Sequence, residues 1–312
     1  MGSVGIIANL AAGKDIRRLV AHASTFDNLE KVNIARRVLL GLAAADVDEV
    51  LWMPDAIGIL TRALQHLDGA PAGTALDFEP TFTHADSTRA AAVLRERGVG
   101  CIVTLGGDGT NRAVAKGCGH VPLVAISTGT NKVFPRLMEG TVAGLAAGAV
   151  ASGMLDVAAV TRPTLCLEIL RDGRPVDLAL VDVAVCSDRF VGARAVWDPG
   201  AMREVVTTTA RSDVTGLSSI GGFLSGMHLR ADRAWRWRSA AAARACSHRL
   251  RRGWCSPSRS HHTGGWQSVR WPTWSVRAAC WPWTVSARSP FDPASGFACG
   301  RAIVVRGWSK SE

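Results

Sequence analysis

The chain has 312 residues, enough for two ordinary domains, and a formal net charge of +10. The positive excess is confined to residues 231–312, which hold 14 Lys and Arg against 3 Asp and Glu, whereas residues 1–230 hold 22 against 23. This split excludes a nucleic-acid-binding interpretation of the whole protein.

The eight cysteines lack the spacing of metal ligands, since no Cys-x-x-Cys pair occurs. We expect buried, reduced thiols. The N-terminus has neither the basic flank nor the long apolar run of a signal peptide, and the Ala/Gly-rich stretch 141–154 is too short to span a bilayer. A cytoplasmic protein without a membrane span is therefore expected, and its oligomeric state, a homo-oligomer included, stays open.

Residues 1–153 alternate short apolar runs with helical patterns. Strands are expected at residues 4–8, 49–53, 101–105 and 121–126, and helices at 27–40, 86–97 and 110–116. Asp27 and Asp86 are the expected helix caps. The alternation predicts an α/β, Rossmann-like domain with a parallel sheet, in which ligands bind beyond the carboxyl ends of the strands.

Residues 154–230 have a different texture. β-branched or alternating runs at 165–170, 176–185 and 205–209 are separated by turns such as Arg171–Arg174. This pattern predicts a mainly β, sandwich-type second domain.

Residues 231–312 change again and contain nine of the 11 Trp but one Leu and one Ile. Trp-Arg-Trp-Arg at 235–238 and the pair His261-His262 leave an RNA-binding arm or a metal site open. We favour a slip of the reading frame in GC-rich DNA. Codons that end in G or C, read one base earlier, turn residues 246–261 and 279–288 into ordinary protein-like segments. The second domain would then be truncated or disordered at its C-terminal end, followed by a poorly packed tail.

The strongest functional signal is a glycine-rich loop between a predicted strand and a predicted helix. Its glycines let the backbone approach a phosphate chain, and the amides at the start of the helix favour anions. Asp108 can hold Mg²⁺ or accept a proton from an attacking hydroxyl, and Thr110 adds a hydroxyl donor. The alternative is a plain turn with Asp108 as an exposed helix cap. The loop consists of Gly106, Gly107, Asp108, Gly109 and Thr110.

With this loop and three further motifs, the chain resembles the ATP-NAD kinase/acetoin catabolism protein X family, within the superfamily of NAD kinases and diacylglycerol-type lipid kinases. The resemblance covers roughly residues 4–230. The motifs that carry it are residues 9–15, 106–111, 127–135 and 216–222.

The resemblance implies an N-terminal nucleotide domain, a C-terminal β-sandwich and an active site between them. Asp108 inherits the catalytic role by motif match, and it is also the candidate ligand for Mg²⁺. The inherited phosphate and nucleotide contacts comprise Gly106, Gly107, Gly109, Thr110, Asn9, Gly13, Thr128, Gly129, Thr130 and Asn131. Leu10 departs from the proline that is common in the lipid kinases.

The implied activity is phosphorylation of NAD at the adenosine ribose 2′-hydroxyl, a step of NADP biosynthesis, with ATP or polyphosphate as donor and Mg²⁺ as cofactor. A lipid or small-alcohol kinase and a non-catalytic nucleotide-binding accessory of acetoin catabolism are the alternatives. Related lipid kinases carry a late Asp-Gly-Glu element that this chain lacks. The shifted frame supplies it at residues 283–286, so we expect the tail to compromise the activity of this copy.

Overall fold

The computed structural model describes residues 2–14, 25–129, 133–186, 201–214 and 216–225, and four strands at 235–238, 268–270, 274–285 and 303–306. After residue 223 the description covers the backbone alone. The chain divides into two compact units. The first is Met1–Thr164 with Trp281–Ser295, and the second is Leu165–Cys280 with Gly296–Glu312.

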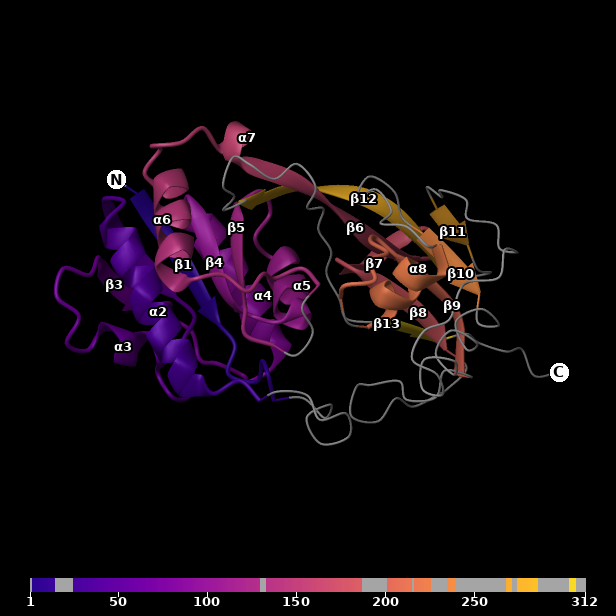
Figure 1. Ribbon diagram of the computed structural model, residues 1–312, viewed down its shortest axis with the longest axis horizontal. Coiled ribbons are helices and arrows are strands. Elements are labelled where there is room, and N and C mark those ends of the chain that lie inside the picture. The colour runs from indigo at the N-terminus through magenta and orange to yellow at the C-terminus, as the bar shows by residue number, and fades with distance from the viewer. Residues whose placement is uncertain are drawn as a thin grey trace. The chain divides into compact units, whose positions relative to one another are not determined.

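The first unit confirms the predicted α/β domain (Figure 1). Five neighbouring strands run parallel in the order β3-β2-β1-β4-β5. The strands are β1 (Gly2–Ala8), β2 (Val47–Trp52), β3 (Ala72–Ala75), β4 (Cys101–Gly106) and β5 (Leu123–Ser127). The helices are α2 (Asn28–Ala43), α3 (Ile59–Leu64), α4 (His84–Glu96), α5 (Asp108–Ala115), α6 (Gly140–Ala151) and α7 (Val157–Val160).

Two helix starts show how local chemistry sets the boundaries. Asp27 is the N-cap of α2, as predicted, and accepts a hydrogen bond from Leu29 N. The prediction that Asp86 opens α4 is wrong, because Thr83 is the cap. Asp86 lies three residues later and completes a capping box, its carboxylate accepting hydrogen bonds from the amides of Thr81 and Thr83.

Both faces of the sheet are covered. Helices α2, α3 and α6 pack on one face, where side chains such as Leu39, Leu60 and Ala147 join those of Ile6 and Val103 in one buried cluster. Helix α4 packs on the other face. A Cβ atom on Gly5 would lie 2.5 Å from the side chain of Leu94 in this helix. The alternation of side chains along β1 therefore directs its residues to two separate helix layers.

Helices α2 and α6 touch through glycines. A Cβ on Gly144 would lie 2.2 Å from Val38 O, and one on Gly41 would lie 2.3 Å from Thr141 O. Gly140 and Gly148, one turn to either side of Gly144, face α2 and the segment after it at similarly short range. The spacing of four residues places the three glycines of α6 on one face, so the two backbones meet without side chains between them.

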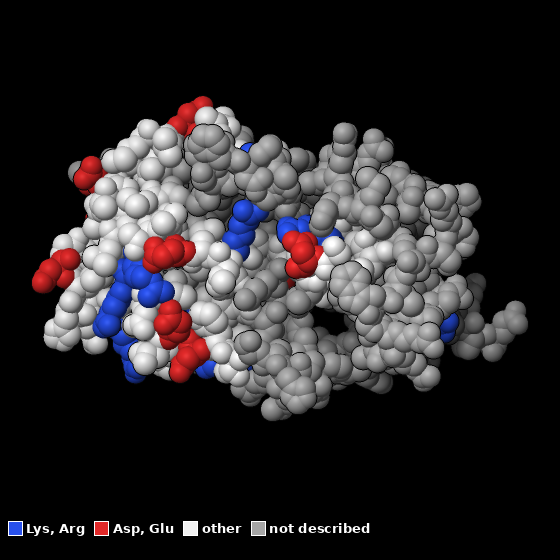
Figure 2. Space-filling model, in the orientation of Figure 1, with Lys and Arg blue, Asp and Glu red and all other residues white. Residues whose placement is uncertain are grey.

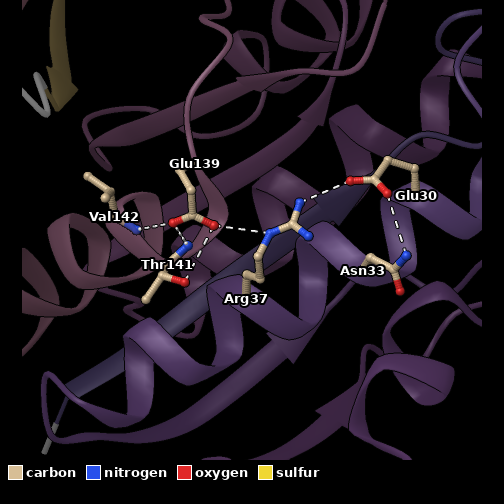
Figure 3. A network of polar contacts seen from close by, with 6 residues as sticks. All are labelled: Glu30, Asn33, Arg37, Glu139, Thr141 and Val142. Atoms are coloured by element: carbon tan, nitrogen blue, oxygen red, sulfur yellow. Dashed lines mark hydrogen bonds and ion pairs between the residues drawn. The ribbon is translucent and has the colours of Figure 1, made fainter.

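A network of polar side chains joins the same two helices at the surface (Figure 3). Arg37 of α2 contacts Glu30 in its own helix at 2.9 Å and Glu139, the N-cap of α6, at 3.0 Å. Glu139 also accepts hydrogen bonds from the amides of Thr141 and Val142. The side chains are about half exposed, so the network fixes geometry more than it adds stability.

The second unit is mainly β, with antiparallel strands, as predicted. Its elements are β6 (Thr161–Arg171), which begins in the first unit, β7 (Arg174–Ala179), β8 (Asp182–Cys186), β9 (Met202–Thr207) and α8 (Leu217–Ser225). Strands β6 and β7 form a hairpin at the predicted turn, in which Asp172 and Gly173 both have positive φ. The prediction of a single run at 176–185 is wrong, because the chain leaves β7 after Ala179 and β8 belongs to another sheet.

Strands also occur beyond residue 230. The second sheet has the order β10-β9-β8-β13, with β10 (Trp235–Arg238) antiparallel to β9 and β13 (Ile303–Arg306) parallel to β8. Strand β11 (Ser268–Arg270) pairs with β12 (Trp274–Val285), whose Thr284 pairs with Leu123 of β5. His261, His262 and Ser286 lie outside the described residues. The predicted domain limits at 153/154 and 230/231 stay predictions.

Charges of both signs are interspersed on the described part of the face in Figure 2, where Lys and Arg side chains lie next to Asp and Glu. Within the residues that the structure describes, no helix combines the length and apolar character needed to cross a membrane.

Asp182 is a buried carboxylate at the start of β8, opposite Thr207 of β9. Its Oδ1 has no hydrogen-bond partner among the described residues. The nearby hydroxyl of Thr207 is engaged with the carbonyls of Val181 and Thr209, at 2.9 and 2.7 Å. Burial raises the pKa of Asp182 from 3.8 to about 7, because a desolvated carboxylate favours its neutral form.

We expect Gly144→Ala to lower the free energy of unfolding by about 2 kcal/mol, because the new methyl group must push the two helix backbones apart. Val142→Ala, on the exposed side of the same helix, should change it by less than about 0.5 kcal/mol. Urea denaturation of both variants measures the difference. Equal effects would contradict the close backbone contact.

Asp182→Asn should stabilise the protein more at pH 8 than at pH 5. The folded-state pKa lies above the unfolded value, so the stability of the parent falls as pH rises from about 4 to about 7. Each unit of that difference corresponds to about 1.4 kcal/mol. Thermal melting at both pH values tests this, with Asp172→Asn in the exposed hairpin turn as control. A gain that is the same at both pH values would contradict the buried charge.

Candidate functional site: three loops at one sheet edge

The three predicted phosphate loops follow β1, β4 and β5, which are neighbours in the sheet and run parallel. Their carboxyl ends therefore lie at one edge. The first loop begins at Asn9, the second at Gly107 and the third at Thr128. The structure thus brings the predicted site residues together in the first unit, except for Thr130 and Asn131, which lie outside the described residues.

Asn9 joins the first loop to the second. Its backbone N–H donates to Leu105 O at 2.9 Å, which continues the pairing of β1 with β4 by one residue. The side-chain Nδ2 donates to Thr110 Oγ1 at 2.8 Å, and Oδ1 accepts from Ala11 N at 2.9 Å. Both polar atoms of the Asn9 side chain are hydrogen-bonded, so the first loop is held in a fixed position relative to the second.

Gly13 brings the first loop against the third. Its φ of +78° favours glycine, and a Cβ there would lie 2.8 Å from Thr128 O and 2.4 Å from Phe26 Cβ. Thr128 N in turn donates to Gly106 O at 3.2 Å. The contact explains why a residue without a side chain is needed here, independently of any ligand.

Asp108 occupies the first turn of α5, and Gly107 is the N-cap, with no side-chain capping bond. The interpretation of Asp108 as an exposed cap is wrong, since 1% of the residue is exposed. Its Oδ1 accepts hydrogen bonds from Val133 N at 3.3 Å and Phe134 N at 3.0 Å. The carboxylate therefore binds the main chain that follows the third loop.

Gly106, the last residue of β4, leaves no room for a side chain. A Cβ on Gly106 would lie 2.5 Å from the side chain of Thr110. Asn111, which matched the family motif but was not predicted as a site residue, is fully buried. It accepts from Thr104 Oγ1 at 2.8 Å and donates to Gly107 O at 3.0 Å. Asn111 therefore links the end of β4 to the start of the turn and stabilises the conformation of the turn.

Sequence reasoning missed Lys31, which is fully buried at the start of α2. Its Nζ donates to Asn9 O, Leu10 O, Ala12 O and Asn28 Oδ1, at 2.9, 3.1, 2.8 and 3.0 Å. The available signal was its position, because Lys31 stands on the same helical stripe as Ala35, Val38 and Leu42. A lysine in a core stripe needs partners, and here they are the carbonyls of the first loop.

The predicted binding of Mg²⁺ depends on which side chains near the three loops could act as metal ligands. Within the described part of the chain, no group of three or more His, Cys, Asp or Glu side chains could hold a metal ion. Mg²⁺ in nucleotide enzymes is held by one or two carboxylates and the phosphates of the substrate. Asp108 as a single carboxylate therefore fits a nucleotide-borne ion, and the described residues do not build a cage of their own.

Known proteins resemble this chain in both halves. Residues 4–152 match the model of the ATP-NAD kinase N-terminal domain, and residues 165–253 match the acetoin catabolism protein X C-terminal domain. Acetoin catabolism protein X of Cupriavidus necator strain H16 is 40% identical over 232 residues, which are 71% of this chain and 65% of that protein. The chain belongs to the ATP-NAD kinase/acetoin catabolism protein X family.

The match spans just under two thirds of the C. necator relative. A solved structure from Bacillus anthracis str. Sterne, of a protein assigned as a diacylglycerol kinase, covers 94% of this chain with a TM-score of 0.52 and 12% identity. The match includes 98% of that structure. At this identity the likeness shows the fold alone.

Proposed function

We propose that this protein is a cytoplasmic, nucleotide-dependent kinase that phosphorylates NAD at the adenosine ribose 2′-hydroxyl with ATP. The observation that carries the proposal is the convergence of three loops at the carboxyl edge of β1, β4 and β5. Such an edge binds phosphates through amides and small residues. Membership of a family that contains ATP-NAD kinases supports the choice of donor and acceptor.

In the proposed reaction the ribose oxygen forms a bond to the γ-phosphorus while the bond from that phosphorus to the β,γ-bridging oxygen breaks. ADP leaves, and the hydroxyl proton passes to a base, for which Asp108 is the candidate. The loops position the phosphates, and Mg²⁺ supplies charge neutralisation when it is bound. Catalysis in this class of reaction is mostly positioning and electrostatic stabilisation.

One observation favours a second function, that of a nucleotide-binding protein without turnover. Asp108 is nearly inaccessible and is bonded to the amides of Val133 and Phe134, as expected of a residue that shapes the loops. A substrate hydroxyl reaches this carboxylate only if the neighbouring main chain moves. The two functions assign different roles to the same side chain, so one substitution separates them.

Asp108→Asn keeps an Oδ1 that can accept both amide hydrogens, but it cannot take up a proton or hold a metal as a carboxylate does. In the kinase, kcat should fall by at least about 10²-fold with ATP affinity little changed. An NADP-forming assay and ATP titration calorimetry measure the two quantities. Val142→Ala serves as the control. An Asn variant as active as its parent would restrict Asp108 to shaping the loops, and transfer to diacylglycerol instead of NAD would identify a lipid kinase.

We further propose that the tail is read out of frame. The composition of residues 231–312 and the Asp-Gly-Glu element of the shifted frame at residues 283–286 support this. The match to the acetoin catabolism protein X C-terminal domain continues to residue 253, past the expected limit at residue 231, so the point of the slip has to be located by sequencing the gene across codons 228–290. We expect the shifted frame to be open throughout, and stop codons in it would refute the slip. Activity is best assayed on a protein that is expressed from the restored frame, in parallel with the 312-residue chain.

A further inference from the structure

The buried ammonium group of Lys31 is surrounded by oxygen atoms of the first loop. Three backbone carbonyls and the side-chain oxygen of Asn28 lie 2.8–3.1 Å from Nζ. An ammonium group has three donors, so the four acceptors use all of them. Lys31 is thus engaged by the protein itself, and it is not arranged to contact a ligand directly.

This arrangement fixes which side of the loop carries its amides. In a planar trans peptide the C=O and the following N–H point in opposite directions. Because the carbonyls of Asn9 and Ala12 point at Lys31, the N–H groups of Leu10 and Gly13 point away from it. Within the part of the chain that the structure describes, neither N–H has an acceptor. The amides of Ala11, Ala12 and Lys14 are hydrogen-bonded within the loop, so Leu10 and Gly13 supply the two amides that an anion can bind.

We propose that Lys31 is a positioning residue for nucleotide phosphate, which turns the carbonyls of the first loop inward and leaves the amides of Leu10 and Gly13 to face the ligand. This inference rests on the proposed function. The lysine also contributes a positive charge behind the loop, which attracts a polyanion without touching it. Through Asn9, whose side chain reaches Thr110, the same contacts set the position of the glycine-rich loop.

The positive charge of Lys31 depends on pH within the range in which ATP binding can be measured. Burial, followed by the positive charge of Lys14, lowers the pKa of Lys31 from 10.5 to about 8, while Asp27 and Asp55 act in the opposite direction. As the pH rises through about 8, the amine loses one donor and its charge. The inward pull on the carbonyls and the attraction for phosphate should weaken together.

Lys31→Met preserves the length of the side chain and removes both the donors and the charge. We expect ATP, titrated calorimetrically at pH 7.5, to bind about tenfold more weakly, as the loss of one nearby charge on a polyanion site implies. Lys116→Met, an exposed lysine just beyond the far end of α5, is the matched control and should bind ATP like the parent. A Lys31 variant that melts earlier but binds ATP with unchanged affinity would show a purely structural role and overturn the proposal.

The parent chain alone provides a second test, which is decisive if the Lys31 variant fails to fold. Between pH 7.5 and 9.5 the affinity for ATP should fall by about tenfold with a midpoint near pH 8, a dependence absent from a folded Lys31→Met variant. A flat profile would overturn the proposal. ATP binding without phosphoryl transfer would defeat the proposed kinase and leave Lys31 in its role, whereas no ATP binding by the parent would overturn both.

Discussion

The parallel pairing of β4 with β1 on one side and β5 on the other is the constraint on which the candidate site depends. Both pairings extend to the carboxyl ends of the strands, where Ala8 faces Leu105 and Gly106 faces Ser127. The chain leaves all three strands at the same level and must turn there. The three turns are consequently neighbours, and short polar contacts such as that from Asn9 to Thr110 are enough to fix one loop against another.

The packing of α2 against α6 also helps to position the first loop. Helix α2 carries Lys31 at one end and the glycine contact with α6 at the other, where the backbones meet at Gly41 and Gly144. A rigid helix makes the position of its first turns follow from the packing of its last ones. The buried lysine can then meet three carbonyls at once, a geometry that a surface lysine with its rotamer freedom rarely maintains.

Sequence patterns predicted the parts that depend on periodicity and local chemistry. The parallel strands, the Asp27 cap and the hairpin turn at Asp172 all follow from short-range rules. The rest required tertiary information. No glycine or proline interrupts the run at 176–185, so its composition does not mark the change of sheet between Ala179 and Asp182. The partners of Asp108 lie 25 and 26 residues away. Lys31 was visible as an anomaly in a core stripe, but only the fold shows that its partners are main-chain carbonyls.

These contacts bear on how a phosphate site gains affinity. Several donors and acceptors of the described loop residues are already engaged within the protein, through Asn9, Lys31, Asp108 and Asn111. The entropy of ordering the described loops is therefore spent during folding, and little of it remains to oppose ligand binding. A loop ordered in this way presents a fixed set of amides, which suits the phosphates that all nucleotides share. The choice of acceptor must then come from groups outside the three loops, because a phosphate-shaped edge cannot distinguish a ribose hydroxyl from another alcohol.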